Sequence, residues 1–331
     1  TSIRFIFSTP KIEQFVVESL MEKHKIVFFG DSVLQADHAN SNTKRTLVEH
    51  LEGQLKTDIL EVSSAAYNPS MYYHLLKTLI ILNPKVETII IPINLRAFSS
   101  SWINVPEYQF EQECSILSII YLDPNFACIK DHILNLLFPE RIVDKRKQFL
   151  NEAIRSVGFL QTTKRRFFNE NSCKFNREVY TCENKYDLNQ AAVYLSAGLK
   201  ASEIMIPMRL NYHYGESLEN NNISLESLQK INEFSKFLDK RIIFYVTPHN
   251  MEYIQLYSGE IILNIMAENV NKISDILNSK NIYFIDFTQL LEKKHFDLEC
   301  SCEHIDNQGK YKLASELSKF IMKVDIRTES K

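Results

Sequence analysis

Short apolar runs of strand length alternate with segments of helical periodicity in both flanks of this 331-residue chain. In the first flank, strands are expected at residues 25–29, 59–62 and 86–93, with a helical segment ahead of each. The second flank repeats the alternation, with strands expected at residues 241–246 and 282–286. Strands that are linked through helices pair in parallel, and the helices then cover both faces of the sheet. The sequence therefore predicts an α/β fold with a three-layer, doubly wound parallel sheet.

The middle of the chain, residues 100–222, does not show this alternation of strands and helices and is rich in aromatic, asparagine and charged residues. Helical patches are expected at residues 129–137 and 149–157, so we interpret the segment as a largely helical insertion within a single domain of residues 1–331. Long insertions are often functional, which favours a lid or substrate platform, although a purely structural cap fits the same pattern. At its end, Asn222-Ile223-Ser224 matches a glycosylation sequon and also a helix N-cap, and we favour the cap.

Charge and hydropathy exclude several classes of function. The chain has 38 basic and 41 acidic side chains and a net charge of −3, so it has no general electrostatic attraction to nucleic acid or anionic membranes. No run of 18 apolar residues suited to crossing a bilayer is present. Residues 2–7 could be the tail of a removed signal or membrane anchor, or an ordinary first strand.

The six cysteines leave the redox compartment open. Cys173 and Cys182 flank a polar loop and make the most plausible disulfide, which would indicate an oxidising compartment, whereas six reduced thiols would indicate the cytosol. Cys300-Ser301-Cys302-Glu303-His304 superficially resembles a metal cluster. Zinc sites need a second ligand pair at wider spacing, and no such pair is visible. We therefore expect neither a metal nor any other cofactor.

Polar residues follow the expected strands at one edge of the predicted sheet. Gly30-Asp31-Ser32 follows the first strand, Asn94 follows the third, and His304 precedes the last helix, which is expected from residue 307. Ligands bind at the carboxyl ends of the strands in open α/β sheets. A serine, a histidine and an amide donor are the groups that acyl transfer requires. This edge is therefore the candidate active site.

The ordered set Gly30-Asp31-Ser32, Asn94 and His304 resembles the SGNH (GDSL) hydrolase superfamily. Within it, the extracytoplasmic O-acyltransferase, esterase and D-alanyl-transfer branch is the nearest in style, through the runs at residues 92–99, 247–249 and 285–304. The resemblance covers residues 20–100 and 225–325 and does not extend to the insertion. It implies an SGNH or flavodoxin-like sheet and a serine-dependent reaction.

The resemblance also implies roles for individual residues. Ser32 would be the nucleophile and His304 the general base. The backbone N–H of Ser32 and the side chain of Asn94 would form the oxyanion hole. Asp31 would shape the turn, and Asp31, Arg96 and His249 are weaker candidates for contacting the substrate.

The chain departs from the family pattern at two positions. The family places an aspartate three residues before the histidine, and this chain has Ser301 there. The third catalytic member therefore stays open between Glu299, Ser301 and Asp297. Glu303 adjoins the histidine, where orientation is usually unfavourable for pairing. The family's glycine after the second strand is replaced by the run Ala65-Ala66, which can supply the same backbone N–H if its angles permit.

The resemblance implies an O-acetylesterase or O-acyltransferase that forms an acyl-serine. The partners would be an acyl donor and a carbohydrate or cell-envelope polymer as acceptor, without nucleic acid. The location would be extracytoplasmic, periplasmic or at the cell surface, with a possible membrane anchor upstream. The two departures keep an alternative open, which is a catalytically degenerate glycan-binding or assembly protein on the same scaffold.

Overall fold

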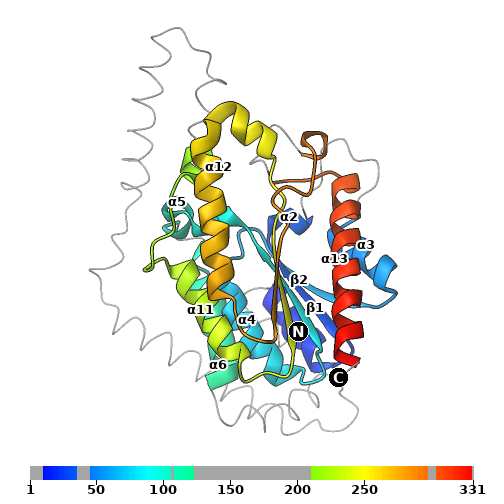
Figure 1. Cartoon of the computed structure of the whole chain (residues 1–331). Helices are drawn as coiled ribbons and strands as arrows, with labels where there is room; N and C mark the ends of the chain where they lie inside the picture. The colour runs from blue at the N-terminus through cyan, green and yellow to red at the C-terminus, as the bar shows by residue number, and fades with distance from the viewer. Residues whose placement is uncertain (1–9, 36–44, 106–107, 123–209, 297–302, 330–331) are drawn as a thin grey trace, which may run out of the picture. The chain divides into compact units, whose positions relative to one another are not determined.

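The computed structural model describes residues 10–35, 45–105, 108–122, 210–296 and 303–329. By its contacts the chain divides into two compact units, residues 1–14 with 122–208 and residues 15–121 with 209–331. The second unit holds a five-stranded sheet (Figure 1). Its strands are β1 (Ile26–Gly30), β2 (Ile59–Ser63), β3 (Thr88–Ile93), β4 (Arg241–Val246) and β5 (Ile282–Asp286).

All neighbouring strands of the sheet pair in parallel, in the order β2-β1-β3-β4-β5. The prediction of a parallel α/β fold is confirmed. The order is the flavodoxin-like one, in which the chain reverses its direction of travel across the sheet between β1 and β3. A crevice outside the carboxyl ends of the strands at such a switch point is the usual ligand position. Gly30 and Asn94, which end β1 and follow β3, therefore lie at the favoured place.

Helices lie on both faces of the sheet (Figure 1). On one face α3 (Leu47–Leu55) packs against α13 (Asn307–Glu329), and on the other α11 (Ile223–Ser235) packs against α4 (Pro69–Leu82) and α12 (Met251–Ile276). Further helical elements are α1 (Pro10–Leu20), α2 (Ser32–Gln35), η2 (Leu95–Phe98), α5 (Ser100–Ile103), α6 (Glu111–Leu122) and η4 (Lys293–His295).

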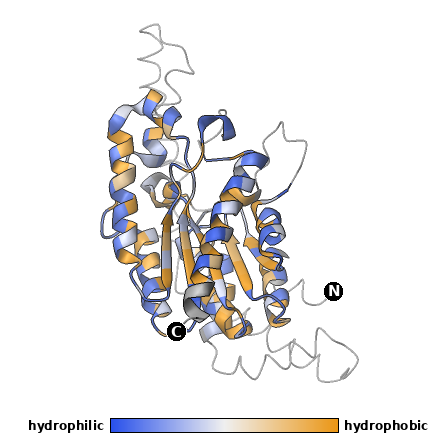
Figure 2. Cartoon of the chain, turned by 45° about the vertical axis from the view of Figure 1, so that its right-hand side comes forward, coloured by the Kyte–Doolittle hydropathy of each residue, from blue (hydrophilic) through white to orange (hydrophobic). Residues whose placement is uncertain are grey.

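The core beneath α3 and α13 is formed by the strands and the inner faces of these helices. Phe28, Ile90 and Ile243 stand side by side on β1, β3 and β4, and each is at most 1% exposed. Leu51 and Leu317 cover them from the two helices. Figure 2 shows the strands as nearly continuous apolar ribbons, as expected for a sheet buried on both faces. Each such side chain stabilises the fold by about 1.5–3 kcal/mol.

Two helices of the second face begin at asparagine caps. The Asn68 side chain accepts hydrogen bonds from Ser70 N and Met71 N, and Pro69 occupies the first turn of α4. The Asn222 side chain accepts from Ser224 N and Leu225 N at the start of α11. The interpretation of residues 222–224 as a helix cap is confirmed.

Helix α12 is longer than its sequence pattern indicates. Regular apolar spacing predicts a helix over residues 263–277, and the structure begins it at Met251. Gly259 has a φ of 65°, which kinks the helix between two parts. In the earlier part Leu256 is 67% exposed and Ile261 just after the kink is 73% exposed, so no apolar stripe marks this stretch in the sequence.

Several sequence predictions fall outside the described residues. These are the first residues of the chain, the helical patches at 129–137 and 149–157, and the cysteines Cys128, Cys173, Cys182, Cys300 and Cys302. Cys114 forms no disulfide with the described residues, and its Sγ lies 3.8 Å from Met71 Sδ. Among the helices that the structure describes, none is long and apolar enough to cross a membrane.

Candidate active site

The turn from β1 into α2 depends on Gly30. A Cβ atom on Gly30 would lie 1.9 Å from Leu34 Cδ1 and 3.3 Å from Ser63 Cβ. Leu34 is fully buried, so its side chain cannot move aside to make room for a Cβ atom. Only glycine lets α2 fold back so closely on β1, and this places Ser32 in the first turn after the strand. The Ser32 side chain is half-buried, and its hydroxyl forms no hydrogen bond to other described residues.

Asp31 joins this turn to the end of β3. Its carboxylate is 3% exposed; Oδ1 accepts from Val33 N at 2.9 Å and Oδ2 accepts from Asn94 Nδ2 at 2.8 Å. Asn94 Oδ1 in turn accepts from Arg96 N at 3.1 Å, which fixes the orientation of the amide. Asn94 Nδ2 carries a second N–H, which has no acceptor in the part of the chain that the structure describes. This N–H could donate to a ligand.

A buried ion pair lies next to these residues. Arg96, on η2, pairs through Nη2 with Oε1 of Glu303, and Glu303 is fully buried. Glu303 Oε2 accepts a hydrogen bond from Tyr214 Oη at 3.2 Å. The Arg96 guanidinium also lies 4.0 Å from the ring centroid of Trp102. Arg96 and Glu303 are far apart along the chain, so their pairing was not predicted from the sequence.

The two candidate histidines lie beside this ion pair. His304 follows Glu303 directly and is half-buried. His249 is fully buried, and its Nδ1 lies 2.7 Å from the carbonyl oxygen of Thr247, to which it can only donate. Burial is the largest effect on His249 and holds its pKa below the usual range, although the negative charge of Glu303 acts in the opposite direction. The neutral ring then presents Nε2 as an acceptor, and this atom has no partner among the described residues.

The structure thus brings together Asp31, Asn94 and Arg96. His249 lies beside them, because its ring centroid is 5.2 Å from that of Tyr214, which donates to the Glu303 partner of Arg96. Ser32 and His304 adjoin members of this group in sequence. All three candidates for the third catalytic member, Asp297, Glu299 and Ser301, lie outside the described residues. Substrate contacts by Asp31, Arg96 and His249 stay predictions, and the side chains of all three are buried.

The electrostatic setting of Asp31 is unusual for a carboxyl group. Burial, foremost, and the negative charge of Glu303 raise the pKa of Asp31 from its ordinary 3.8 to about 6. The hydrogen bonds from Asn94 and Val33 act in the opposite direction without offsetting the burial. The folded state therefore binds a proton more tightly than the unfolded state between about pH 4 and pH 6.

An Asp31→Asn variant should reveal this linkage. In the wild type the contribution of Asp31 to the free energy of unfolding falls as the pH rises through this window, by up to about 3 kcal/mol. Asparagine does not titrate, so the stability of the variant relative to the wild type should increase from pH 4 to pH 6 and then level off. Urea denaturation at a series of pH values measures this difference. A difference in stability that does not change between pH 4 and pH 6 would contradict the assignment.

The turn after β2 lies beside Gly30, since Ser64 N donates to Gly30 O at 3.3 Å. Ala66 in this turn has a φ of 65°, in the left-handed region that favours glycine. The resemblance places a glycine after this strand, and the backbone here takes a glycine-like conformation. Sequence reasoning missed this, because an alanine gives no signal of a positive φ.

Ala66→Gly is expected to raise the free energy of unfolding by about 1 kcal/mol, because it relieves the left-handed strain. Ala65→Gly, one residue earlier and without a positive φ, should lower it by a similar amount because only chain entropy changes. Thermal unfolding of the two variants gives the comparison. Equal destabilisation by both would rule out strain at Ala66.

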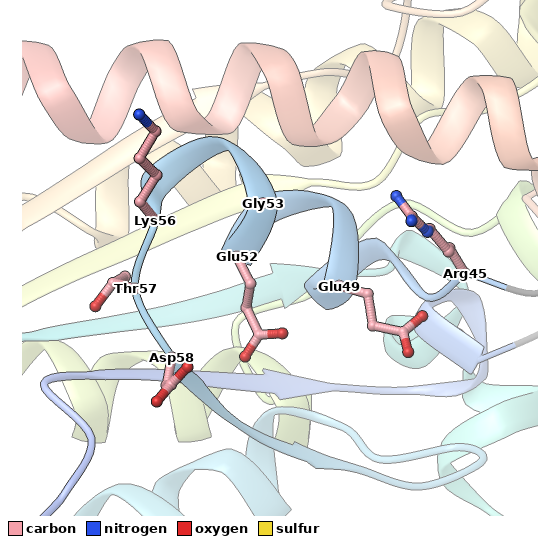
Figure 3. Close-up of a pocket in the computed structure, with 7 residues that line it drawn as sticks. All are labelled: Arg45, Glu49, Glu52, Gly53, Lys56, Thr57 and Asp58. Atoms are coloured by element: carbon pink, nitrogen blue, oxygen red, sulfur yellow. The ribbon is translucent and has the colours of Figure 1, made fainter.

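A surface depression lies away from this edge, where α3 leads into the amino end of β2 (Figure 3). It is lined by Arg45, Glu49, Glu52, Gly53, Lys56, Thr57 and Asp58. Glu49 completes the capping box of α3 with Thr46, and Glu52 Oε1 accepts from Ile59 N at 2.9 Å. Glu49 and Glu52, two of its three acidic side chains, thus accept local backbone hydrogen bonds, and the open polar hollow offers no convergent chemistry.

In the described part of the chain, no group of three or more histidine, cysteine, aspartate or glutamate side chains could hold a metal ion. A scan against models of known protein families finds no match, and a search of curated proteins finds no significantly similar sequence. The carboxyl edge of the sheet is therefore the feature that points to a function.

Proposed function

We propose that the chain is an SGNH-type serine enzyme that acts on acyl esters, either as an O-acetylesterase or as an O-acyltransferase. The observation that carries the proposal is the Asn94–Asp31 hydrogen bond of 2.8 Å at the carboxyl ends of β3 and β1. It ties an amide with an available N–H to the residue before Ser32. A nucleophile and an oxyanion donor at the switch point of a flavodoxin-like sheet are the parts that this chemistry needs.

The reaction would proceed through an acyl-serine. Ser32 Oγ attacks the ester carbonyl while His304 takes its proton, and the oxyanion accepts hydrogen bonds from Ser32 N–H and Asn94 Nδ2–H. The C–O bond to the alcohol then breaks, and His304 returns the proton to the departing oxygen. Water or a sugar hydroxyl attacks the acyl-serine in the second half. Water as the attacking group gives hydrolysis, and a sugar hydroxyl gives transfer.

Two further features support the assignment. The parallel strand order is compatible with the flavodoxin-like sheet that the resemblance implies, and Ser32 follows the carboxyl end of β1. The turn after β2 holds Ala66 in a glycine-like conformation beside Gly30, where the family uses a glycine N–H. The proposed substrates are acylated carbohydrates or cell-envelope polymers outside the cytoplasm, with residues 100–222 as the segment that selects the acceptor.

A non-catalytic glycan-binding or assembly protein is the second candidate. The serine at position 301 favours it, since an aspartate there would hold the tautomer of His304. In this case Ser32 would be vestigial. The candidate retains the same scaffold and predicts binding without turnover.

The test is acetate release from an O-acetylated polysaccharide, with a chase by soluble glycan acceptors. Release that Ser32→Ala abolishes supports the esterase, and transfer to the chase glycan supports the acyltransferase. No release by the wild type, together with equal glycan binding by wild type and Ser32→Ala, would replace the proposal by the binding protein.

A further inference from the structure

We propose that Arg96 and Glu303 form a positioning pair that fixes the general base His304 relative to the Ser32 turn. The proposal rests on the proposed function of Ser32 and His304. It assigns Arg96 a positioning role in place of the substrate contact that the sequence suggested. It also supplies a way to hold His304 in a chain that lacks an aspartate at position 301.

Glu303 is anchored on both carboxylate oxygens. Arg96 Nη2 forms an ion pair with Oε1, and Tyr214 Oη donates a hydrogen bond to Oε2 at 3.2 Å. Burial of a lone carboxylate is highly unfavourable, so these two partners are needed to keep it in place. Burial alone would raise the pKa of Glu303. The charge of Arg96, together with nearby histidines, outweighs this effect and holds the pKa below its usual range. Glu303 therefore stays ionised and paired.

Arg96 is also linked by hydrogen bonds to the turn that carries Ser32, the proposed nucleophile. Its backbone N–H donates to Asn94 Oδ1 at 3.1 Å, and Asn94 in turn holds Asp31, the residue before Ser32. Two side chains of α11 also hold the turn η2 that carries Arg96. Ser224 Oγ donates to Ala97 O and Asn222 Nδ2 donates to Phe98 O, each at 2.7 Å.

His304 lies between two fixed neighbours. Glu303 before it has no exposed surface, and Ile305 after it is 1% exposed and pairs with Phe296 in an antiparallel bridge. The backbone on both sides of His304 is thus held, on one side by the ion pair and on the other by the bridge. A continuous series of contacts runs from Asp31 through Asn94 and Arg96 to Glu303. Loss of the ion pair would release one of the two anchors.

Glu303→Gln is the test variant, because it keeps the shape and an acceptor for Tyr214 while it removes the charge. We expect kcat for an activated acetyl ester to fall about 10²-fold with little change in KM, as expected for a displaced catalytic group. In spectra with ¹⁵N-labelled histidine, the His304 ring signals, assigned from His304→Ala, should shift. Glu316→Gln breaks an exposed pair with Lys319 on α13 and is the matched control, with no expected change in either measurement.

Tyr214→Phe is the milder variant if Glu303→Gln does not fold. It removes one hydrogen bond to Oε2 and should lower kcat about tenfold in the same direction. A folded variant with unchanged kcat and unchanged His304 signals would overturn the positioning role. If the wild type itself lacks activity, the proposed function fails, and the shift of the His304 signals still decides whether Glu303 positions that ring.

Discussion

Ser32→Ala is expected to lower kcat for an activated acetyl ester by a factor on the order of 10³ to 10⁶, because it removes the hydroxyl that we propose as the nucleophile. The fold should not suffer, since the Ser32 hydroxyl makes no hydrogen bond to other described residues and the turn is fixed by Gly30 and Asp31. Steady-state hydrolysis, with circular dichroism to check folding, gives the measurement.

The control for this prediction is Ser315→Ala, a half-buried serine within α13 and away from the sheet edge. It should keep wild-type turnover. His304→Ala should lose a similarly large factor, because nucleophile and base act as a unit and their separate losses do not add. Turnover of Ser32→Ala at the wild-type level would remove Ser32 from the chemistry.

Arg96→Ala is expected to lower the free energy of unfolding by about 3–5 kcal/mol, the largest effect on stability that we predict. It removes the positive charge that pairs with the buried Glu303 carboxylate, and an uncompensated buried charge is strongly unfavourable. The guanidinium also loses its packing on Trp102. Urea denaturation at neutral pH measures the change.

Two further variants distinguish the effect of an unpaired buried charge from a general loss of packing. Lys319→Ala breaks an exposed ion pair on α13 and should change stability by at most about 1 kcal/mol. The double variant Arg96→Met with Glu303→Leu should regain much of the loss, because apolar replacement of a buried ion pair is often nearly neutral. A double variant less stable than Arg96→Ala would show that the loss comes from packing rather than from the charge of Glu303.

The sequence was sufficient for the class of fold because strands and helices have different apolar periods. The strands at residues 241–246 and 282–286 were predicted with the bounds that the structure gives them. The order of the strands could not be predicted, since an apolar run carries no information about its neighbour in the sheet. The early part of α12 was missed because Leu256 and Ile261 are exposed and break the helical stripe.

The site was predictable where a residue follows a strand end directly. Ser32, Asn94 and Arg96 follow β1 and β3, and the topology brings these strands side by side. The ion pair between Arg96 and Glu303 was not predictable, because it joins residues whose contact depends on the tertiary fold. Tyr214 was missed because it falls within residues 100–222, where the sequence does not show the alternation of strands and helices.

The most direct measurement is peptide mapping of the covalent adduct that forms when the whole protein reacts with a fluorophosphonate, a reagent for activated serines. We predict a single modified serine, Ser32, and much slower modification in His304→Ala, since the base activates the hydroxyl. Adducts spread over several serines, or a wild type that does not react, would contradict serine-dependent acyl chemistry at this site.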